Sequence, residues 1–240
     1  MNMSSLWKAG LLVFVAVAAV ACGGGGGGTG TTKPRIGFLN ASFDSTALTF
    51  KIDGDVKASA LGYLGSSASF IEEKQDSYDL AVQEDGSGNP DLDSFVTNFL
   101  NQKEYMVAAV GQENYGSEPL KRLRLVAPQI DLTLPNGNTS RIYFLHAFSR
   151  AAGFDTPAID VRNPGDNPQY EVDAIDFGST GTLTVDASTQ TFVARRSGTE
   201  SVYATSTFTF VSGGIYIGVV CGIENGTGTQ APKIQFIKVN

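Results

Sequence analysis

The stretch Arg35-Ile36-Gly37-Phe38-Leu39-Asn40-Ala41 decides the fold, because it recurs 106 residues later as Arg141-Ile142-Tyr143-Phe144-Leu145-His146-Ala147 with five of seven positions identical. A second echo links residues 105–114 to residues 216–225, since both begin with Tyr, continue apolar and end in Gly, any residue, Glu, Asn. The offset grows to 111 at the second echo, and an insertion of about five residues belongs in a loop. A unit of this length is a domain rather than a solenoid repeat of about 20 to 50 residues. The sequence therefore predicts two tandem copies of one domain.

Each copy shows the alternation typical of half-buried antiparallel strands. Leu48, Phe50 and Ile52 alternate with polar residues, and residues 78–83 and 205–211 repeat the pattern. We count about seven short strands per copy with turn signals between them, and this pattern predicts an all-β fold of two tandem β-sandwiches.

One segment is ambiguous between strand and helix. Leu92, Phe95, Val96, Phe99 and Leu100 also fit a helical stripe behind possible caps at residues 91 and 93. The corresponding residues of the second copy, 205–211, are strand-like, and duplicated domains share a fold. We therefore expect a strand in both copies.

The chain begins with the layout of a signal peptide, residues 1–21. Residues 11–21 contain no polar side chain, but as a helix they reach only about 16 Å against a hydrocarbon core of about 30 Å. Ala19, Val20 and Ala21 before Cys22 resemble the lipobox of bacterial lipoproteins. The resemblance implies that Cys22 becomes the acylated amino terminus, with ordinary cleaved secretion and a retained anchor as the alternatives. Gly23 after it would, by resemblance, permit outer-membrane sorting.

The sequence after the leader divides into a tether, two domains and a linker. Residues 22–34 begin with Cys22 and six glycines and predict a flexible tether, whose 11 residues up to Lys33 span roughly 18 Å. Residues 35–127 form the first predicted sandwich and residues 141–240 the second. Residues 128–140 are the predicted linker, because two prolines and an Asn-Gly turn interrupt the pattern there.

Two cysteines in an exported chain could instead form a disulfide between Cys22 and Cys221. The glycine-rich tether disfavours that pairing. Cys221 closes an apolar run, residues 215–221, and is better interpreted as a small buried hydrophobic residue.

The repeated pattern resembles the bacterial extracytoplasmic family known as domain of unknown function 4397. Its members open with an Arg-apolar strand, a His-Ala-Ser-Pro-Asp-like turn and a strand ending in Asp-Gly. Residues 40–44 and Asp53-Gly54 of copy one match this pattern, as do His146-Ala147 and residues 159–161 of copy two, although Asn40 replaces His and the turn proline is missing. The resemblance spans nearly everything from Arg35 onward. It implies tandem immunoglobulin-like sandwiches in an envelope or secreted protein, with no established activity.

Asn40 and His146 occupy the same position of the repeat, at the end of its first strand. A hydrogen-bonding residue that structures the following turn accounts for both. No nucleophile motif accompanies this single histidine, so the sequence predicts no enzyme. A hydrolase that uses paired carboxylates remains the alternative, although no spacing selects a pair.

The sharpest functional pattern is the loop Asp85, Ser87, Asn89, Asp91 and Asp93, which places oxygen-bearing side chains at every second position, as calcium loops do. Pro90 stands where an EF-hand requires Gly, and copy two lacks the feature. Calcium-assisted adhesion or assembly is therefore the alternative to a protein without a cofactor.

The net negative charge of the chain disfavours one class of partner, nucleic acid. The net charge of −7 becomes −8 once residues 1–21, whose only charged residue is Lys8, are removed, and such a surface repels nucleic acid. The remaining expectation is a non-enzymatic lipoprotein at the cell envelope, periplasm-facing or on the outer-membrane surface. Its anchor would be the lipid, and it would be a structural or ligand-binding module for an envelope protein or a glycan. Without tryptophan beyond Trp7, glycan stacking would fall to tyrosines such as Tyr63, Tyr115, Tyr143 and Tyr170.

Overall fold

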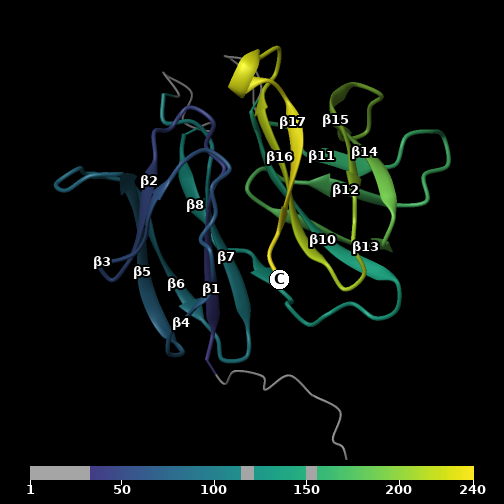
Figure 1. Cartoon of the computed structure of the whole chain (residues 1–240). Coiled ribbons are helices and arrows are strands. Elements are labelled where there is room, and N and C mark those ends of the chain that lie inside the picture. The colour runs from purple at the N-terminus through teal and green to yellow at the C-terminus, as the bar shows by residue number, and fades with distance from the viewer. Residues whose placement is uncertain (1–32, 115–121, 150–155) are drawn as a thin grey trace, which may run out of the picture. The chain divides into compact units, whose positions relative to one another are not determined.

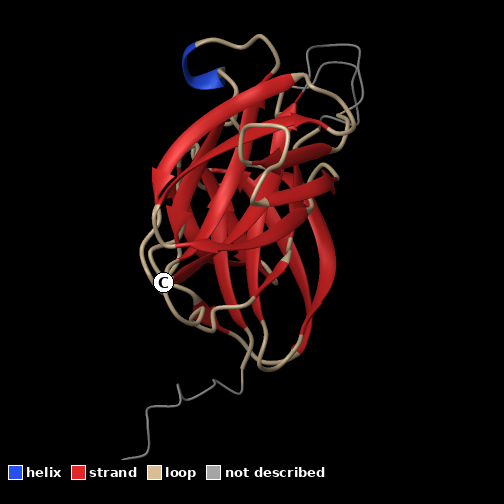
Figure 2. Ribbon diagram, turned by 90° about the vertical axis from the view of Figure 1, so that its right-hand side faces the viewer, coloured by secondary structure: helices blue, strands red, loops and turns tan. Residues whose placement is uncertain are grey.

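The computed structural model describes residues 33–114, 122–149 and 156–240, all within the unit Thr31–Asn240. The regular elements of the described residues are strands, apart from one helical turn, η2 (Gly228–Gln230) (Figure 2). The predicted all-β fold of two tandem sandwiches is confirmed.

The first sandwich pairs an outer sheet of order β3-β2-β5-β6 with an inner sheet of order β4-β1-β7-β8, in which β9 also pairs with β7 (Figure 1). The strands of the outer sheet are β2 (Leu48–Ile52), β3 (Asp55–Leu61), β5 (Asp76–Glu84) and β6 (Asp91–Phe99). Those of the inner sheet are β1 (Arg35–Asn40), β4 (Ile71–Glu72), β7 (Glu104–Val110), β8 (Arg124–Val126) and β9 (Gln129–Ile130).

The second sandwich repeats this topology strand for strand, except that β9 has no counterpart among its described residues. Its outer sheet has the order β12-β11-β14-β15 and its inner sheet the order β13-β10-β16-β17. The strands are β10 (Thr139–Ser149), β11 (Ile159–Arg162), β12 (Glu171–Ile175), β13 (Thr180–Asp186), β14 (Thr189–Arg196), β15 (Val202–Thr209), β16 (Ile215–Ile223) and β17 (Lys233–Lys238). The sequence echoes thus correspond to β1 with β10 and β7 with β16.

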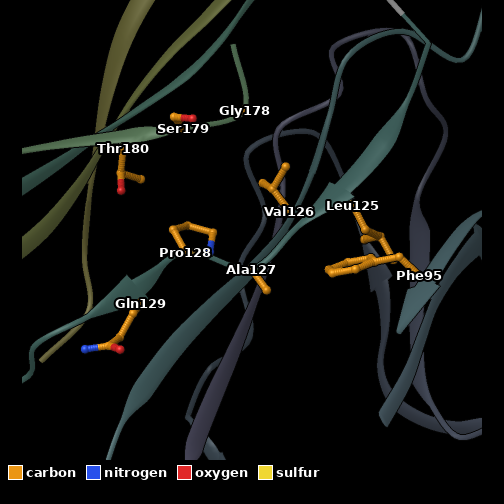
Figure 3. Close-up of a pocket in the computed structure, with 9 residues that line it drawn as sticks. All are labelled: Phe95, Leu125, Val126, Ala127, Pro128, Gln129, Gly178, Ser179 and Thr180. Atoms are coloured by element: carbon orange, nitrogen blue, oxygen red, sulfur yellow. The ribbon is translucent and has the colours of Figure 1, made fainter. Parts of the chain in front are cut away.

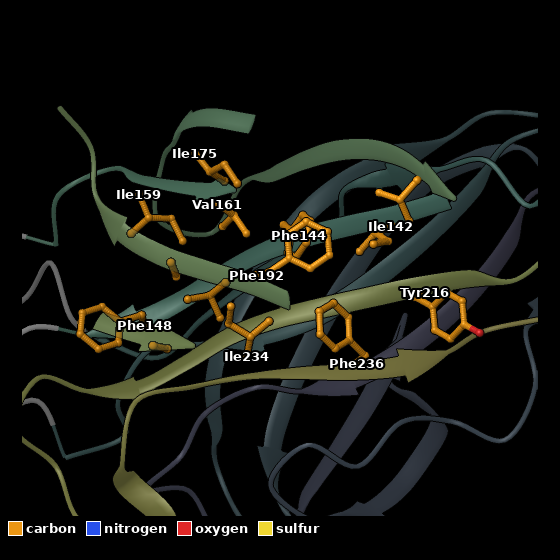
Figure 4. Packing of buried hydrophobic residues seen from close by; sticks show 14 of the residues in the cluster. Ile142, Phe144, Phe148, Ile159, Val161, Ile175, Phe192, Tyr216, Ile234 and Phe236 are labelled. Atoms are coloured by element: carbon orange, nitrogen blue, oxygen red, sulfur yellow. The ribbon is translucent and has the colours of Figure 1, made fainter. Parts of the chain in front are cut away.

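Three apolar cores hold four sheets together. One lies inside each sandwich, and the second sandwich's core includes Phe144, Phe192 and Phe236 (Figure 4). The third core lies between the two inner sheets and includes Leu39, Ala108, Leu145 and Val219. The halves therefore pack back to back through a continuous apolar interface.

Successive residues of the inner strands serve different cores. In β10, Ile142 and Phe144 enter the core of the second sandwich, whereas Tyr143 and Leu145 enter the interface. The two echoed strands of each copy pair in parallel, β1 with β7 and β10 with β16. Strands buried on both faces are continuous apolar runs, which is why the echoes are apolar at nearly every position.

The structure bears on two local predictions, the ambiguous segment and the linker. Residues 91–99 form β6, so the strand interpretation of the ambiguous segment is confirmed. Within residues 128–140, the predicted linker, Gln129 and Ile130 form β9 against β7, and the Tyr143 hydroxyl accepts the Asp131 N–H at 2.7 Å.

Candidate functional site

The strand directions define two ends of the folded unit. β1 and β7 start together at Arg35 and Glu104, β10 and β16 run parallel, and the Val239 N–H is donated to the Ile215 carbonyl. We call this the tether end, because the predicted tether joins the chain here at Lys33. The opposite end, the loop end, comprises residues 41–47, 84–91, 111–114, 196–201 and 222–231, which follow or connect the far ends of these strands.

At the loop end the first Gly-x-Glu-Asn echo forms a turn around one carboxylate. Gly111 has a φ of 98°, a conformation that glycine adopts without steric cost. The Asp44 carboxylate accepts the N–H of Glu113 at 2.9 Å and the N–H of Asn114 at 3.0 Å. Asp44, which follows β1, therefore fixes the residues that follow β7.

The second echo also begins with a left-handed glycine, and a main-chain hydrogen bond holds the residues that follow it. Gly222 has a φ of 100°, and a Cβ there would lie 2.5 Å from the Ala231 carbonyl oxygen, so only glycine fits. The N–H of Glu224 is donated to the Ser149 carbonyl at 2.9 Å. Both echoes therefore end, at the loop end, in polar turns that are held by hydrogen bonds to their main-chain N–H groups.

Gln112 lies between two hollows at the loop end. One, of about 390 Å³, is lined by Phe43, Asp44, Gln112, Asn114, Ile223 and Gln230 and therefore draws on both copies. The other, of about 360 Å³, is lined by Asp91, Leu92, Gln112, Glu113, Arg122 and Leu123. Gln112 is only 7% exposed, and its Nε2 has no hydrogen-bond partner among the described residues.

The loop end is acidic. Burial raises the pKa of Glu113 above its ordinary value, and the nearby carboxylates of Glu84 and Asp44 raise it further. The Thr46 hydroxyl donates to Glu84 at 2.9 Å. These groups disfavour an anion at this end of the molecule.

Another hollow, of about 560 Å³, lies between the halves away from Gln112 (Figure 3). It is open, and its walls are Phe95, the segment 125–129 and residues 178–180. Beside Gly178, the Arg124 guanidinium lies 4.7 Å from the Phe177 ring centroid and donates to the Phe177 carbonyl at 2.7 Å. Among the described residues that line it, none carries a buried polar side-chain atom without a hydrogen-bond partner.

Asn40 and His146 make equivalent contacts in the two copies. Asn40 donates from Nδ2 to the Leu61 carbonyl at 2.9 Å, and its Oδ1 accepts the Ser42 N–H. His146 Nδ1 lies 3.0 Å from the Ile175 carbonyl, where β12 ends as β3 ends at Leu61. Burial lowers the pKa of His146 to about 4, so the ring is neutral at pH 7.

Cys221 lies fully buried in the interface core, which confirms its interpretation as a buried hydrophobic residue. Burial raises the pKa of its thiol to about 11. A disulfide from Cys221 to another segment would require the interface to open. Cys22, the predicted lipidation site, lies outside the described residues.

The five residues of the predicted calcium loop do not converge. The carboxylate of Asp85 accepts the Thr49 hydroxyl at 2.6 Å and the Ala60 N–H at 3.2 Å, whereas Asp91 pairs with Lys51 at 3.1 Å. Asp93 instead accepts the Leu125 N–H at 2.8 Å. Ser87 lies exposed in the turn, and Asn89 donates back to the carbonyls of residues 84 and 85. Across the described ranges, no group of three His, Cys, Asp or Glu residues is placed to hold a metal.

The structural role of Asp85 has a counterpart in the second copy. Ala60 has a φ of 54°, and Asp85 secures its N–H. Ala174, at the matching place in β12, has a φ of 52° and donates its N–H to Asp160 at 2.9 Å. Asp85 therefore stabilises an irregular edge strand, as Asp160 does in the second copy. The regular spacing of oxygen-bearing residues in the loop did not indicate this structural role.

We therefore expect Asp85→Ala to lower the free energy of unfolding by about 1–3 kcal/mol, since the buried Thr49 hydroxyl and the exposed Ala60 N–H lose their acceptor. The loss should be equal with and without millimolar calcium, as measured by urea denaturation. Ser87→Ala in the exposed turn is the control and should change stability by less than about 0.5 kcal/mol. A calcium-dependent rise in Tm that Asp85→Ala removes would support the calcium interpretation.

The tyrosines considered for glycan stacking are largely committed to packing. Tyr143 belongs to the interface core, against which Tyr63 packs, and Tyr170 packs against the core of the second sandwich. Tyr115 lies outside the described residues. In the part of the chain that the structure describes, no helix is long and apolar enough to cross a membrane.

Comparison with known proteins assigns this chain to no family. No family profile and no curated protein matches the chain. Among solved structures, the TIE protein of Bacillus anthracis is 10% identical with a TM-score of 0.26, and the match covers 79% of this chain but only 34% of that one. A CBM26 module from Eubacterium rectale in complex with maltoheptaose is 12% identical with a TM-score of 0.26, covering 86% and 97%. A putative cell adhesion protein from Bacteroides ovatus is 8% identical with a TM-score of 0.25, covering 88% and 96%. This chain therefore spans about a third of the TIE protein, and scores this low carry no argument about function.

Proposed function

We propose that this chain is a non-enzymatic lipoprotein of the cell envelope, anchored through Cys22, that binds a partner with its loop end. The observation that carries the proposal is the placement of the two ends. The predicted tether joins at Lys33, at the start of β1, whereas the polar turns of both echoes lie at the far ends of the strands. An anchor at one end leaves the other end accessible for binding.

The apolar interface supports a rigid binding module. Because the two inner sheets share a buried core, the loops of both copies are held on one scaffold. Binding residues are commonly carried on loops that a rigid scaffold positions. The partner would be an envelope protein or a glycan, and the acidic charge of the chain disfavours nucleic acid.

The anchor is tested by Cys22→Ser in cells that process lipoproteins. We expect the native chain in the membrane fraction, with an intact mass equal to residues 22–240 plus acyl chains. Cys22→Ser should leave that fraction or retain the leader, because no thiol is available for the thioether.

Cys221→Ser is the matched control, since its side chain is buried and should not affect membrane association. The proposed lipid anchor at Cys22 would be contradicted if the native chain carried no acyl chains, or if the native chain and Cys22→Ser associated equally with the membrane.

A further inference from the structure

The chain contains two Asn-Gly pairs, and the fold holds them differently. Asn136-Gly137 lies between β9 and β10, and Asn225-Gly226 lies between β16 and η2. In such a pair the main-chain nitrogen of the glycine can attack the side-chain amide of the asparagine, because glycine has no side chain to obstruct the close approach. Both pairs therefore carry this potential reactivity in their sequence, and the structure decides which of them can use it.

In the first pair the attacking nitrogen is free. Asn136 and Gly137 are both exposed, and neither the Gly137 N–H nor the Asn136 side chain has a hydrogen-bond partner among the described residues. The hydrogen bonds that hold this turn end on carbonyl oxygens instead. The Thr139 hydroxyl donates to the Asn136 carbonyl at 2.6 Å, and the Ser212 hydroxyl donates to the Gly137 carbonyl at 3.1 Å. The two reacting groups are therefore not engaged elsewhere.

In the second pair the same nitrogen is bonded and enclosed. The Gly226 N–H is donated to the Ile223 carbonyl at 2.9 Å. A Cβ at Gly226 would lie 2.3 Å from the Gln230 carbonyl oxygen, whereas a Cβ at Gly137 would meet nothing within 4 Å. Attack on the Asn225 side chain requires the hydrogen bond of Gly226 to break and this crowded turn to rearrange.

We propose that Asn136 is a site of spontaneous deamidation in the folded protein, and that the fold protects Asn225. The Gly137 nitrogen forms a bond to Cγ of Asn136, and the bond from Cγ to the side-chain nitrogen breaks. That nitrogen leaves as ammonia with the proton given up by the Gly137 N–H, and a succinimide ring remains. Water then adds to either ring carbonyl and opens the ring to aspartate or isoaspartate. The sum is one water consumed and one ammonia released.

The reaction changes the tether end of the molecule. Residues 136 and 137 precede β10, which starts at that end, so each event adds a negative charge there and none at the loop end. The isoaspartate product also lengthens the main chain by a methylene group, between the carbonyls that Thr139 and Ser212 contact.

The experiment follows both pairs in the same chain. The full chain is incubated in neutral buffer made with heavy-oxygen water, folded in one sample and unfolded by guanidinium chloride in the other. Peptide mapping by mass spectrometry then measures the conversion of Asn136 and Asn225. In the folded chain we expect Asn136 to convert at least about tenfold faster, since Asn225 must first lose a hydrogen bond and leave a crowded turn. In the unfolded chain this difference should disappear.

Two controls separate the proposal from exposure alone. Asn138 is exposed in the same turn but precedes Thr139, whose side chain obstructs the attack, and it should convert far more slowly than Asn136. Asn136→Gln should remove conversion at this position and leave Asn225 unchanged, because the longer side chain closes a larger ring.

The proposal is overturned if Asn225 converts as fast as Asn136 in the folded chain, or if Asn136 converts only in guanidinium chloride. Acylation at Cys22 would stand in either case, so failure of this inference is distinct from failure of the proposed anchor.

Discussion

Phe144→Ala and Leu145→Ala are each expected to lower the free energy of unfolding severely, by about 3–5 kcal/mol for the phenylalanine and about 2–5 kcal/mol for the leucine. These neighbours in β10 are 0% and 1% exposed. The Phe144 ring centroid lies 5.2 Å from that of Phe192 inside the second sandwich, whereas Leu145 lies in the interface core. Because both faces of β10 are buried, either truncation leaves a cavity.

The outer sheet provides the contrast. In β14, Phe192 is fully buried, but its neighbour Thr191 bonds Thr207 across an exposed face at 2.8 Å. We expect Phe192→Ala to cost about 3–5 kcal/mol and Thr191→Ala less than about 1 kcal/mol. Urea denaturation measures the stability of all four variants. If Leu145→Ala proved as mild as Thr191→Ala, the interface between the inner sheets would not contribute to folding.

The sequence predicted the architecture because duplication left readable echoes. Alternation at Leu48, Phe50 and Ile52 indicated strands with one solvated face, and these residues do lie in an outer sheet. The back-to-back packing of the inner sheets was not foreseen. The uninterrupted apolar runs at residues 105–110 and 215–221 carried that signal, since strands covered on both faces lose their alternation.

The candidate site was predicted less well. The Gly-x-Glu-Asn echo was visible in the sequence, but its residues meet Asp44 and Gln230 only through tertiary structure. Regular spacing suggested a calcium loop from Asp85 to Asp93, yet hydrogen bonds to Ala60 and Leu125 engage those two carboxylates in different places. Spacing along the chain shows which oxygens are near in sequence, and strand pairing decides which can face a common point.

Acidification from pH 7 to pH 4 is expected to destabilise the protein by ~3 kcal/mol through His146 alone. Burial lowers the pKa of His146 to about 4, whereas an unfolded chain titrates near 6.5. Between these values the unfolded state binds the proton and the folded state does not, so stability falls as the pH falls through this window. Below about pH 4 both states are protonated, and the contribution of His146 stops growing.

His146→Asn isolates this effect, because Asn40 already occupies the equivalent position and makes the equivalent carbonyl contact. The variant cannot titrate, so its free energy of unfolding should fall less steeply between pH 6.5 and pH 4, as measured by urea denaturation at several pH values. Carboxylates with lowered pKa, such as Asp131 and Asp160, contribute to both curves and cancel in their difference. Any fixed cost of the substitution shifts the whole curve without changing its slope. Parallel curves for the two proteins across this window would show that His146 is not held neutral by burial.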